Sequence, residues 1–185
     1  VTASLGWMEQ AANVVRQFRG KGLACEIFTG SGTGTCEIDG RIPELTDLQA
    51  GSYTMMDAEY SGIGSSENLS RFEKFPPALT LLKSVINTNH RDHVTVDAGL
   101  KALYHDGATP FVLNPALPDL RYEWRGDEHG QMNFPEGTVR FELGDVLELV
   151  VSHCDPTVNL FDVLYMTHND KVTDVWPVDM RGKCM

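Results

Sequence analysis

The chain changes character after residue 57, and this change limits the folds open to it. Apolar residues recur at helical spacing over Leu5–Arg19, which predicts an amphipathic helix that ends near Gly20 and Gly22. A strand predicted at 23–28 then leads directly into a Gly-rich loop. A helix, a strand and a ligand-sized loop form the repeating unit of α/β proteins, so the first part is predicted to be α/β.

The rest of the chain has the pattern of an all-β module. An extended stretch at 51–57 and a loop of Gly and Ser at 61–66 come first. Gly, Pro and Asp residues then separate predicted strands at 78–87, 93–97, 137–143, 146–152, 161–167 and 171–176. We expect a boundary between Asp57 and Phe75, and divide the chain into residues 1–65, the end of an α/β domain, and residues 66–185, a β domain.

Composition excludes several classes of protein. The formal charge of −11 and pI of 4.8 argue against a nucleic-acid partner, because phosphate binding needs clustered Lys and Arg. No apolar run is long enough for a membrane helix, and no secretory signal is visible. The cysteines lack the spacing of a zinc site and the density of a disulfide scaffold, so we expect reduced thiols and a cytoplasmic location: Cys25, Cys36, Cys154 and Cys184.

The loop Gly30–Thr35 is a candidate phosphate site. Its sequence, Gly-Ser-Gly-Thr-Gly-Thr, offers backbone N–H groups without side-chain obstruction and several hydroxyls. It has no Walker-type Lys, so a single phosphate on a cofactor fits better than a nucleotide triphosphate. From this loop alone, a flexible surface turn is an equal alternative.

The segment Ser152–Thr157 is the most informative one. If it is extended, His153 and Asp155 point to the same face and can offer a nitrogen and an oxygen to one divalent ion, while Cys154 points away. That donor pair favours Mg²⁺ or Mn²⁺ over Zn²⁺, and water or substrate would complete an open coordination shell. The alternative is a strand that ends in an ordinary turn before Pro156. A nucleophilic Cys154 paired with His153 is disfavoured, because adjacent strand residues face opposite ways.

Other ionisable and aromatic residues are interpreted as structural. The turn Asp127–Gly130 could in principle hold an acid or base, but charged turns are usually solvated. Lys101 could form a Schiff base only if something lowered its pKa, and the sequence shows nothing that would. We expect four further histidines to lie at the surface, and two tryptophans in the core or at an interface: His90, His93, His105 and His168; Trp124 and Trp176.

Six motifs occur together in an order and spacing that resemble one family, the D-threonine aldolases with the related D-3-hydroxyaspartate aldolases and D-serine dehydratases. The motifs span nearly the whole chain, and the long run at 153–160 is the most specific. They lie at residues 30–35, 47–57, 96–103, 127–130, 153–160 and 175–177.

The resemblance implies an alanine-racemase-like fold of type III, in which a β/α barrel holds pyridoxal 5'-phosphate and a C-terminal β domain holds a metal. This chain then corresponds to the C-terminal half, with the last barrel units first, and the enzyme is usually a homodimer. The cofactor is implied to contact Gly32, Thr33, Gly34 and Tyr53. His153 and Asp155 are implied to bind the metal that holds the substrate's β-hydroxyl.

The resemblance also implies an activity: cleavage of a D-3-hydroxy amino acid such as D-threonine to glycine and an aldehyde. In the dehydratase branch the third residue of the His-x-Asp motif is typically Cys and binds zinc, so Asp155 favours the aldolase and Mg²⁺ or Mn²⁺. A D-serine dehydratase, which releases a keto acid and ammonia, is the first alternative. The second is a non-catalytic metal-binding fragment, because no Lys here matches the family's Schiff-base Lys, which is expected in an upstream barrel segment.

Overall fold

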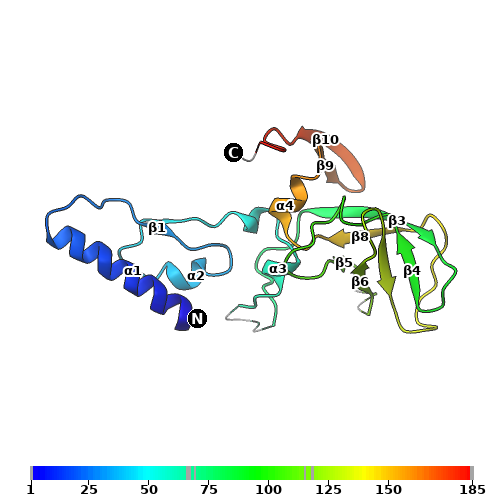
Figure 1. Ribbon diagram of the computed structural model, residues 1–185, viewed down its shortest axis with the longest axis horizontal. Coiled ribbons are helices and arrows are strands. Elements are labelled where there is room, and N and C mark those ends of the chain that lie inside the picture. Colours follow the sequence, from blue (N-terminus) through cyan, green and yellow to red (C-terminus); the bar gives the residue numbers. More distant parts are fainter. Residues whose placement is uncertain (1, 66–67, 69, 115, 118, 184–185) are drawn as a thin grey trace. The chain divides into compact units, whose positions relative to one another are not determined.

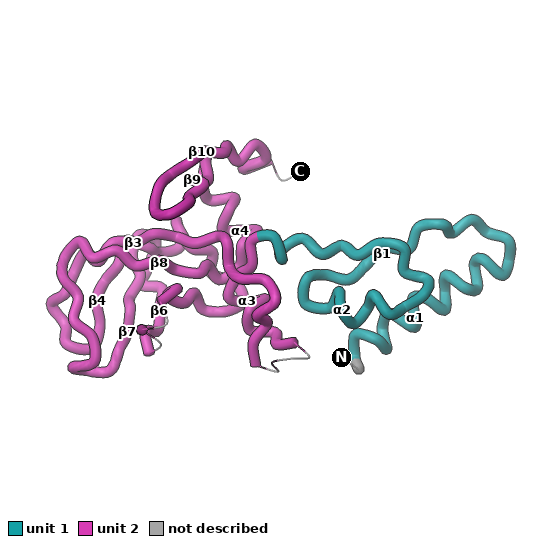
Figure 2. Tube along the Cα trace, turned by 180° about the vertical axis from the view of Figure 1, so that it is seen from behind, with its two compact units in different colours: residues 1–54 teal, residues 55–185 magenta. Residues whose placement is uncertain are grey.

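A computed structural model describes residues 2–65, 68, 70–114, 116–117 and 119–183 (Figure 1). The chain divides into two compact units, residues 1–54 and 55–185, which Figure 2 colours separately. They are described in turn below. None of the helices in the described ranges is long and apolar enough to cross a membrane.

The first unit has the α/β character expected of it. Its elements are helix α1 (Thr2–Gly20), strand β1 (Thr29–Gly30), helix α2 (Cys36–Asp39), strand β2 (Asp47–Leu48) and the 3₁₀ helix η1 (Ser52–Thr54). β1 and β2 pair in parallel, as in β/α units. The predicted helix is confirmed by α1.

Two extended segments predicted for the first part are wrong. Residues 23–28 form no strand. The amide of Thr46 donates to the Phe28 carbonyl at 2.8 Å, directly before β1 begins at Thr29. The upstream side chain of Ile27 is 74% exposed, so it has no sheet to pack against in the described chain. The stretch 51–57 is interrupted by η1 and by the left-handed backbone of Met56 (φ 53°).

The second unit is built on an antiparallel sheet of order β5-β8-β3-β4-β7-β6, with a separate β9–β10 hairpin. Its elements in chain order are α3 (Ala58–Ser61), β3 (Thr80–Asn87), β4 (His93–Val96), β5 (Phe111–Val112), β6 (Arg121–Trp124), β7 (Gly130–Asn133), β8 (Val146–Val150), α4 (Cys154–Val158), β9 (Val163–His168) and β10 (Lys171–Pro177). The predicted strands at 78–87, 93–97, 146–152, 161–167 and 171–176 are therefore confirmed within a few residues.

The strand predicted at 137–143 is wrong. Val139 and Phe141 do pack against the core, but the backbone there turns at Pro135–Thr138 and makes no ladder. The apolar alternation therefore predicted correctly that these side chains are partly buried. It predicted wrongly that the backbone pairs as a strand. The strands β5, β6 and β7 were not predicted.

The core of the second unit is formed by residues on one face of the sheet. Val85, Val94, Val96, Met132, Leu147 and Leu149 are all buried there. Alternate residues point to the opposite face of each strand, so β4 reads intermediate, buried, intermediate, buried. The apolar alternation seen in the sequence is therefore the signature of this half-buried sheet.

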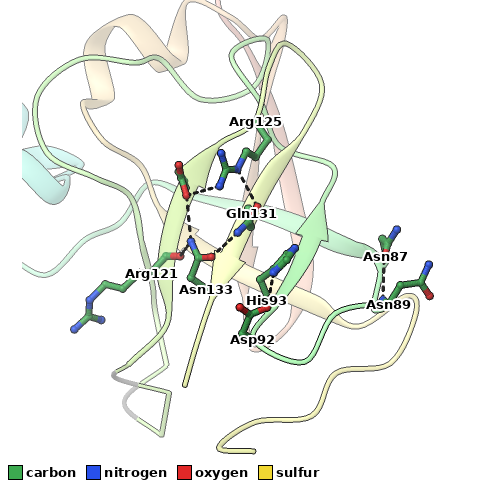
Figure 3. Close-up of polar contacts among 9 residues, drawn as sticks. Asn87, Asn89, Asp92, His93, Arg121, Arg125, Gln131 and Asn133 are labelled. Atoms are coloured by element: carbon green, nitrogen blue, oxygen red, sulfur yellow. Dashed lines mark hydrogen bonds and ion pairs between the residues drawn. The ribbon is translucent and has the colours of Figure 1, made fainter. Parts of the chain in front are cut away.

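The opposite face of β6 and β7 is polar and solvent-facing. Nε of Arg125 donates to Oε1 of Gln131 at 2.8 Å, and the Gln131 amide donates in turn to Asn133 (Figure 3). Exposed cross-strand contacts of this kind contribute about 0.2–1 kcal/mol each and help fix the strand register. His93, expected at the surface, is only partly exposed and bonds through Nδ1 to Asp92 at 2.7 Å.

Two of the sequence motifs interlock on the core face. The hydroxyl of Tyr122 donates to the carbonyl of Ala98 at 2.6 Å, and burial raises the pKa of that phenol. Gly130 lies against both groups, since a Cβ there would be 2.3 Å from the Tyr122 ring and 2.4 Å from the Ala98 carbonyl. The loop that follows Ala98 is thereby fixed to the β6–β7 hairpin.

The compact units divide between residues 54 and 55, eleven residues before the predicted boundary at 65/66. The intervening segment is tied to the β unit by its backbone. The amide of Ala58 donates to the carbonyl of Val151 at 2.9 Å, and that of Glu59 to the carbonyl of Ser152 at 3.2 Å. Sequence composition could not predict these hydrogen bonds, because they join residues far apart in the chain.

Candidate functional site

The two candidate metal ligands, His153 and Asp155, are positioned by the buried carboxylate of Asp57. Asp57 is fully buried, and its Oδ1 accepts a hydrogen bond from the amide of Tyr60 at 2.9 Å, at the start of α3. Its Oδ2 accepts from the amide of Cys154 at 2.9 Å, at the start of α4. Both helices are too short to be stable alone, so this shared cap joins them into one frame.

His153 and Asp155 lie on that frame and come together. Nε2 of His153 is 3.4 Å from Oδ2 of Asp155. His153 is extended (φ −141°, ψ 127°), as expected, but Asp155 lies in the first turn of α4 rather than in a strand. The expectation of a continuous strand is therefore wrong, because the chain turns into a helix at Cys154. Pro156 is compatible with that turn, since a first helical turn needs no Pro N–H.

The rest of the His153 ring faces α3. Its Nδ1 is buried and makes no hydrogen bond within the described residues, and the nearest anion is Oε2 of Glu59 at 3.7 Å. The ring of Tyr60 packs edge-on at a centroid distance of 6.4 Å. One imidazole edge thus faces Asp155 and the solvent, and the other faces the protein.

The His153 and Asp155 side chains fit a divalent ion. Two donors that each lie about 2.0–2.2 Å from one ion are about 3.0–3.5 Å apart, which matches the 3.4 Å separation. The Asp155 side chain is 73% exposed, so water or substrate can complete the shell. No cluster of three or more His, Cys, Asp or Glu suitable for a metal occurs among the described residues.

The loop Gly30–Thr35 in the first unit is a compact turn. Ser31 has a left-handed backbone (φ 71°), and the amides of Thr35 and Cys36 both donate to the Gly32 carbonyl, at 3.1 and 2.9 Å. The predicted cofactor contacts Thr33 and Tyr53 touch one another, because the Tyr53 amide donates to Oγ1 of Thr33 at 3.0 Å. Thr33 is buried, so this contact fixes the loop's inner side.

Hydroxyls of this loop are used inside the unit. Asp39 is buried; burial raises the pKa of its carboxyl, but hydrogen bonds from Ser4, Thr35 and Ser31 together outweigh burial and hold the pKa below its ordinary value. Ser4 Oγ lies 2.6 Å from the Asp39 carboxylate. The carboxylate therefore anchors both ends of the turn.

The loop still fits a phosphate through its backbone. The amides of Thr33 and Gly34 donate to no group in the described part of the chain. A Cβ at Gly32 would meet nothing within 4 Å, so the backbone there is open to a ligand. Free amides beside open space are the donors that a phosphate group uses.

The other candidates are arranged as structural residues. Lys101 pairs with Glu128, and this hydrogen bond raises the pKa of Lys101, which is opposite to what a Schiff-base amine needs. The turn Asp127–Gly130 closes the β6–β7 hairpin and accepts the Lys101 amide at the Asp127 carbonyl, 2.9 Å away. Cys154 is buried with its amide on Asp57 and its Sγ 3.8 Å from Asp155.

The predictions for the other histidines, the tryptophans and the cysteines hold only in part. His90, His105 and His168 are exposed as expected. Trp124 is partly buried and donates to the Leu103 carbonyl at 3.2 Å, whereas Trp176 is 54% exposed. Cys25, Cys36 and Cys154 form no disulfide within the described chain, and Cys184 lies outside the described residues.

Sequence reasoning missed Asp57 and Glu59 as parts of this site. Asp57 lies in a stretch that was predicted to be extended, and its second bond joins residues 97 positions apart. Gly107 was missed as well; it has a left-handed backbone (φ 69°) and lies against the Glu59 carboxylate. In the sequence, the only indication of a turn there is the pair Asp106-Gly107.

The chain is similar to several known proteins. Residues 78–167 match the family described as "Putative serine dehydratase domain". The chain is 38% identical to a D-threonine aldolase from Arthrobacter sp. over 172 residues, 93% of this chain and 44% of the relative. It is 39% identical to a 3-hydroxy-D-aspartate aldolase from Paracoccus denitrificans over 166 residues, 89% of this chain and 42% of the relative.

Solved structures give the same result. A D-threonine aldolase from Filomicrobium marinum superposes with a TM-score of 0.84 at 32% identity, covering 96% of this chain and 48% of that one. An alanine-racemase-like protein from Idiomarina loihiensis shares the fold with a TM-score of 0.71 at 18% identity, over 88% and 46% of the two chains. The chain thus spans a little under half the length of the relatives it matches.

The fold is therefore that of the alanine-racemase-like proteins, with the end of a β/α barrel followed by a C-terminal β domain. Within that class, the chain is homologous to the C-terminal half of the D-threonine and 3-hydroxy-D-aspartate aldolases. Those relatives are carbon–carbon lyases, and the resemblance read from the six motifs is confirmed.

Proposed function

We propose that the protein is an aldolase that uses pyridoxal phosphate and a divalent metal to cleave a D-3-hydroxy amino acid of the D-threonine type to glycine and an aldehyde. The observation that best supports the proposal is the 3.4 Å separation of His153 Nε2 and Asp155 Oδ2 at an exposed edge. Similarity to named aldolases over about nine-tenths of the chain supports the reaction class.

The residues of the second unit would supply a rigid metal site. His153 and Asp155 would hold Mg²⁺ or Mn²⁺, because a carboxylate oxygen and an imidazole without a thiolate suit these harder ions. Such an ion polarises a substrate β-hydroxyl and lowers its pKa. The Asp57 cap keeps the two ligands in place without binding the ion, which limits reorganisation when substrate arrives.

The residues of the first unit would hold the cofactor phosphate. The amides of Thr33 and Gly34 would donate to its oxygens, and the Tyr53–Thr33 contact would keep the loop in shape. Pyridoxal phosphate, when bound, supplies the electron sink for the breaking Cα–Cβ bond. Because the chain spans under half of its relatives, the activity, and the homodimer expected with it, are proposed for the enzyme as a whole.

The match to a serine dehydratase domain favours a second candidate, a dehydratase that expels the β-hydroxyl as water. Asp155 argues for the aldolase, because a third-position thiolate would suit zinc better.

A product assay separates the two reactions. We would supply the complete enzyme, including the barrel segment expected upstream, with pyridoxal phosphate, Mn²⁺ and either D-threonine or D-3-hydroxyaspartate, and measure glycine, aldehyde and ammonia. Equal amounts of glycine and aldehyde that disappear with chelator are the expected result. Keto acid and ammonia instead would establish the dehydratase, and the absence of all products would remove both.

A further inference from the structure

Glu59 lies on the side of His153 away from Asp155. Its Oε2 is 3.7 Å from Nδ1, whereas Asp155 Oδ2 is 3.4 Å from Nε2, so the two carboxylates face different ring nitrogens. Nδ1 is buried and has no other acceptor among the described residues. Glu59 and Asp155 therefore cannot bind one ion through the same ring nitrogen. The Glu59 carboxylate can interact with the ring only at Nδ1.

The Glu59 side chain is 44% exposed, and backbone groups lie on two sides of it. The Glu59 amide is bonded to the Ser152 carbonyl at 3.2 Å, next to His153 in the chain. On the other side, Gly107 leaves room for the carboxylate: a Cβ there would be 2.5 Å from Oε2. The loop carrying Gly107 is tied to the same place, since Ser152 Oγ donates to the Tyr104 carbonyl at 2.5 Å.

We infer that Glu59 is a positioning residue for His153, accepting the Nδ1–H so that Nε2 presents its lone pair toward Asp155, and that Gly107 is there to admit this carboxylate. A neutral imidazole has one N–H and one lone pair, and an acceptor at Nδ1 selects the form whose lone pair is on Nε2. A metal-binding His usually has such a partner on its other nitrogen, and losing it typically weakens metal binding about 10- to 100-fold. The inference rests on the proposed function, because it assigns the partner of a proposed ligand.

The first test measures Mn²⁺ affinity by calorimetry for the wild type and for Glu59→Ala, Glu59→Gln and His153→Ala. We expect Glu59→Ala to raise the Kd about 10- to 100-fold. Glu59→Gln keeps an acceptor oxygen and should recover part of the loss. Glu136→Gln removes an exposed carboxylate that pairs with Arg91, and should leave the Kd unchanged.

The second test leaves Glu59 in place. Gly107→Ala inserts a Cβ where the carboxylate lies, and Gly137→Ala is its matched control, with a similar left-handed backbone (φ 81° against 69°) but open space around the Cβ. Both variants share the backbone strain. We expect Gly107→Ala to weaken Mn²⁺ binding more than Gly137→Ala does, because only the Cβ at position 107 meets the Glu59 carboxylate.

A third readout needs no metal. Nitrogen chemical shifts of the neutral His153 ring should place the proton on Nδ1 in the wild type and lose that preference in Glu59→Ala. If His153→Ala abolishes Mn²⁺ binding while Glu59→Ala leaves both the Kd and the shifts unchanged, the positioning role is overturned and the metal site stands. If His153→Ala binds Mn²⁺ as tightly as the wild type, the proposed metal site fails and the role of Glu59 fails with it.

Discussion

The carboxylate of Asp57 bonds to the amide of Cys154, 2.9 Å away and 97 residues along the chain, while its other oxygen caps α3. This single buried side chain brings the segment after residue 55 to the start of α4. The ligands His153 and Asp155 flank Cys154, so their placement depends on a residue that binds no ion. The site is therefore built from two distant stretches of sequence.

Replacing Asp57 by Ala should destabilise the second unit by about 2–4 kcal/mol, because two helix N-termini lose their cap and two amides lose their acceptors. Urea-induced unfolding measures the loss. Asp57→Asn keeps one acceptor oxygen and should lose less. Asp170→Asn, at an exposed turn, is the control and should stay within about 0.5 kcal/mol of the wild type; a similarly small effect for Asp57→Ala would contradict the shared cap.

Replacing Gly130 by Ala should destabilise the β unit by several kcal/mol, on the order of 3 or more, because the new Cβ would overlap the Tyr122 ring and the Ala98 carbonyl. The variant should also expose the 99–107 loop to hydrogen exchange. Gly62→Ala, whose Cβ meets nothing closer than 3.3 Å, is the comparison. Equal stability for the two variants would show that the motifs do not interlock as described.

The local sequence pattern predicted several strands correctly. It failed for segments whose structure depends on pairing with distant parts of the chain. β3, β8, β9 and β10 have enough alternating or β-branched residues to be seen in sequence. β6 and β7 are only four residues each, and their inward residues, such as Tyr122 and Met132, alternate with polar or charged neighbours. Residues 137–143 show the reverse case, since their apolar side chains pack without strand pairing.

For the candidate site, the sequence indicated the two ligand residues but not their support. His-x-Asp is a local motif, and the resemblance gave it a role. The Asp57 cap and the Glu59 contact join segments about a hundred positions apart, which no local spacing reveals. The turn into α4 was also missed, because an extended reading of residues 152–157 satisfied the same alternation.

Acid should remove part of the stability of the first unit through Asp39. Its folded pKa is below the ordinary value, so its stabilisation is present above about pH 4 and is lost as the pH falls through the folded pKa. Asp39→Asn lacks this charge. The difference in urea midpoint between wild type and Asp39→Asn should shrink from about pH 6 to about pH 3; a difference that grows over this range would mean that the carboxylate is not stabilised in the folded state.

Replacing Asp155 by Cys should change metal preference. A thiolate is a softer donor than a carboxylate, so the ratio of Zn²⁺ to Mn²⁺ affinity should rise by about tenfold or more. Competition between the two ions, followed by calorimetry, gives the ratio. Asp162→Cys adds a thiol at another exposed position and should leave the ratio near that of the wild type. An unchanged ratio in Asp155→Cys would argue that Asp155 does not touch the ion.

The most direct measurement is anomalous diffraction at the manganese edge from crystals of the protein saturated with Mn²⁺ and pyridoxal phosphate. We expect an anomalous peak about 2.0–2.3 Å from both Nε2 of His153 and an oxygen of Asp155. An ion bound elsewhere, with these two side chains ordered and no peak between them, would contradict it.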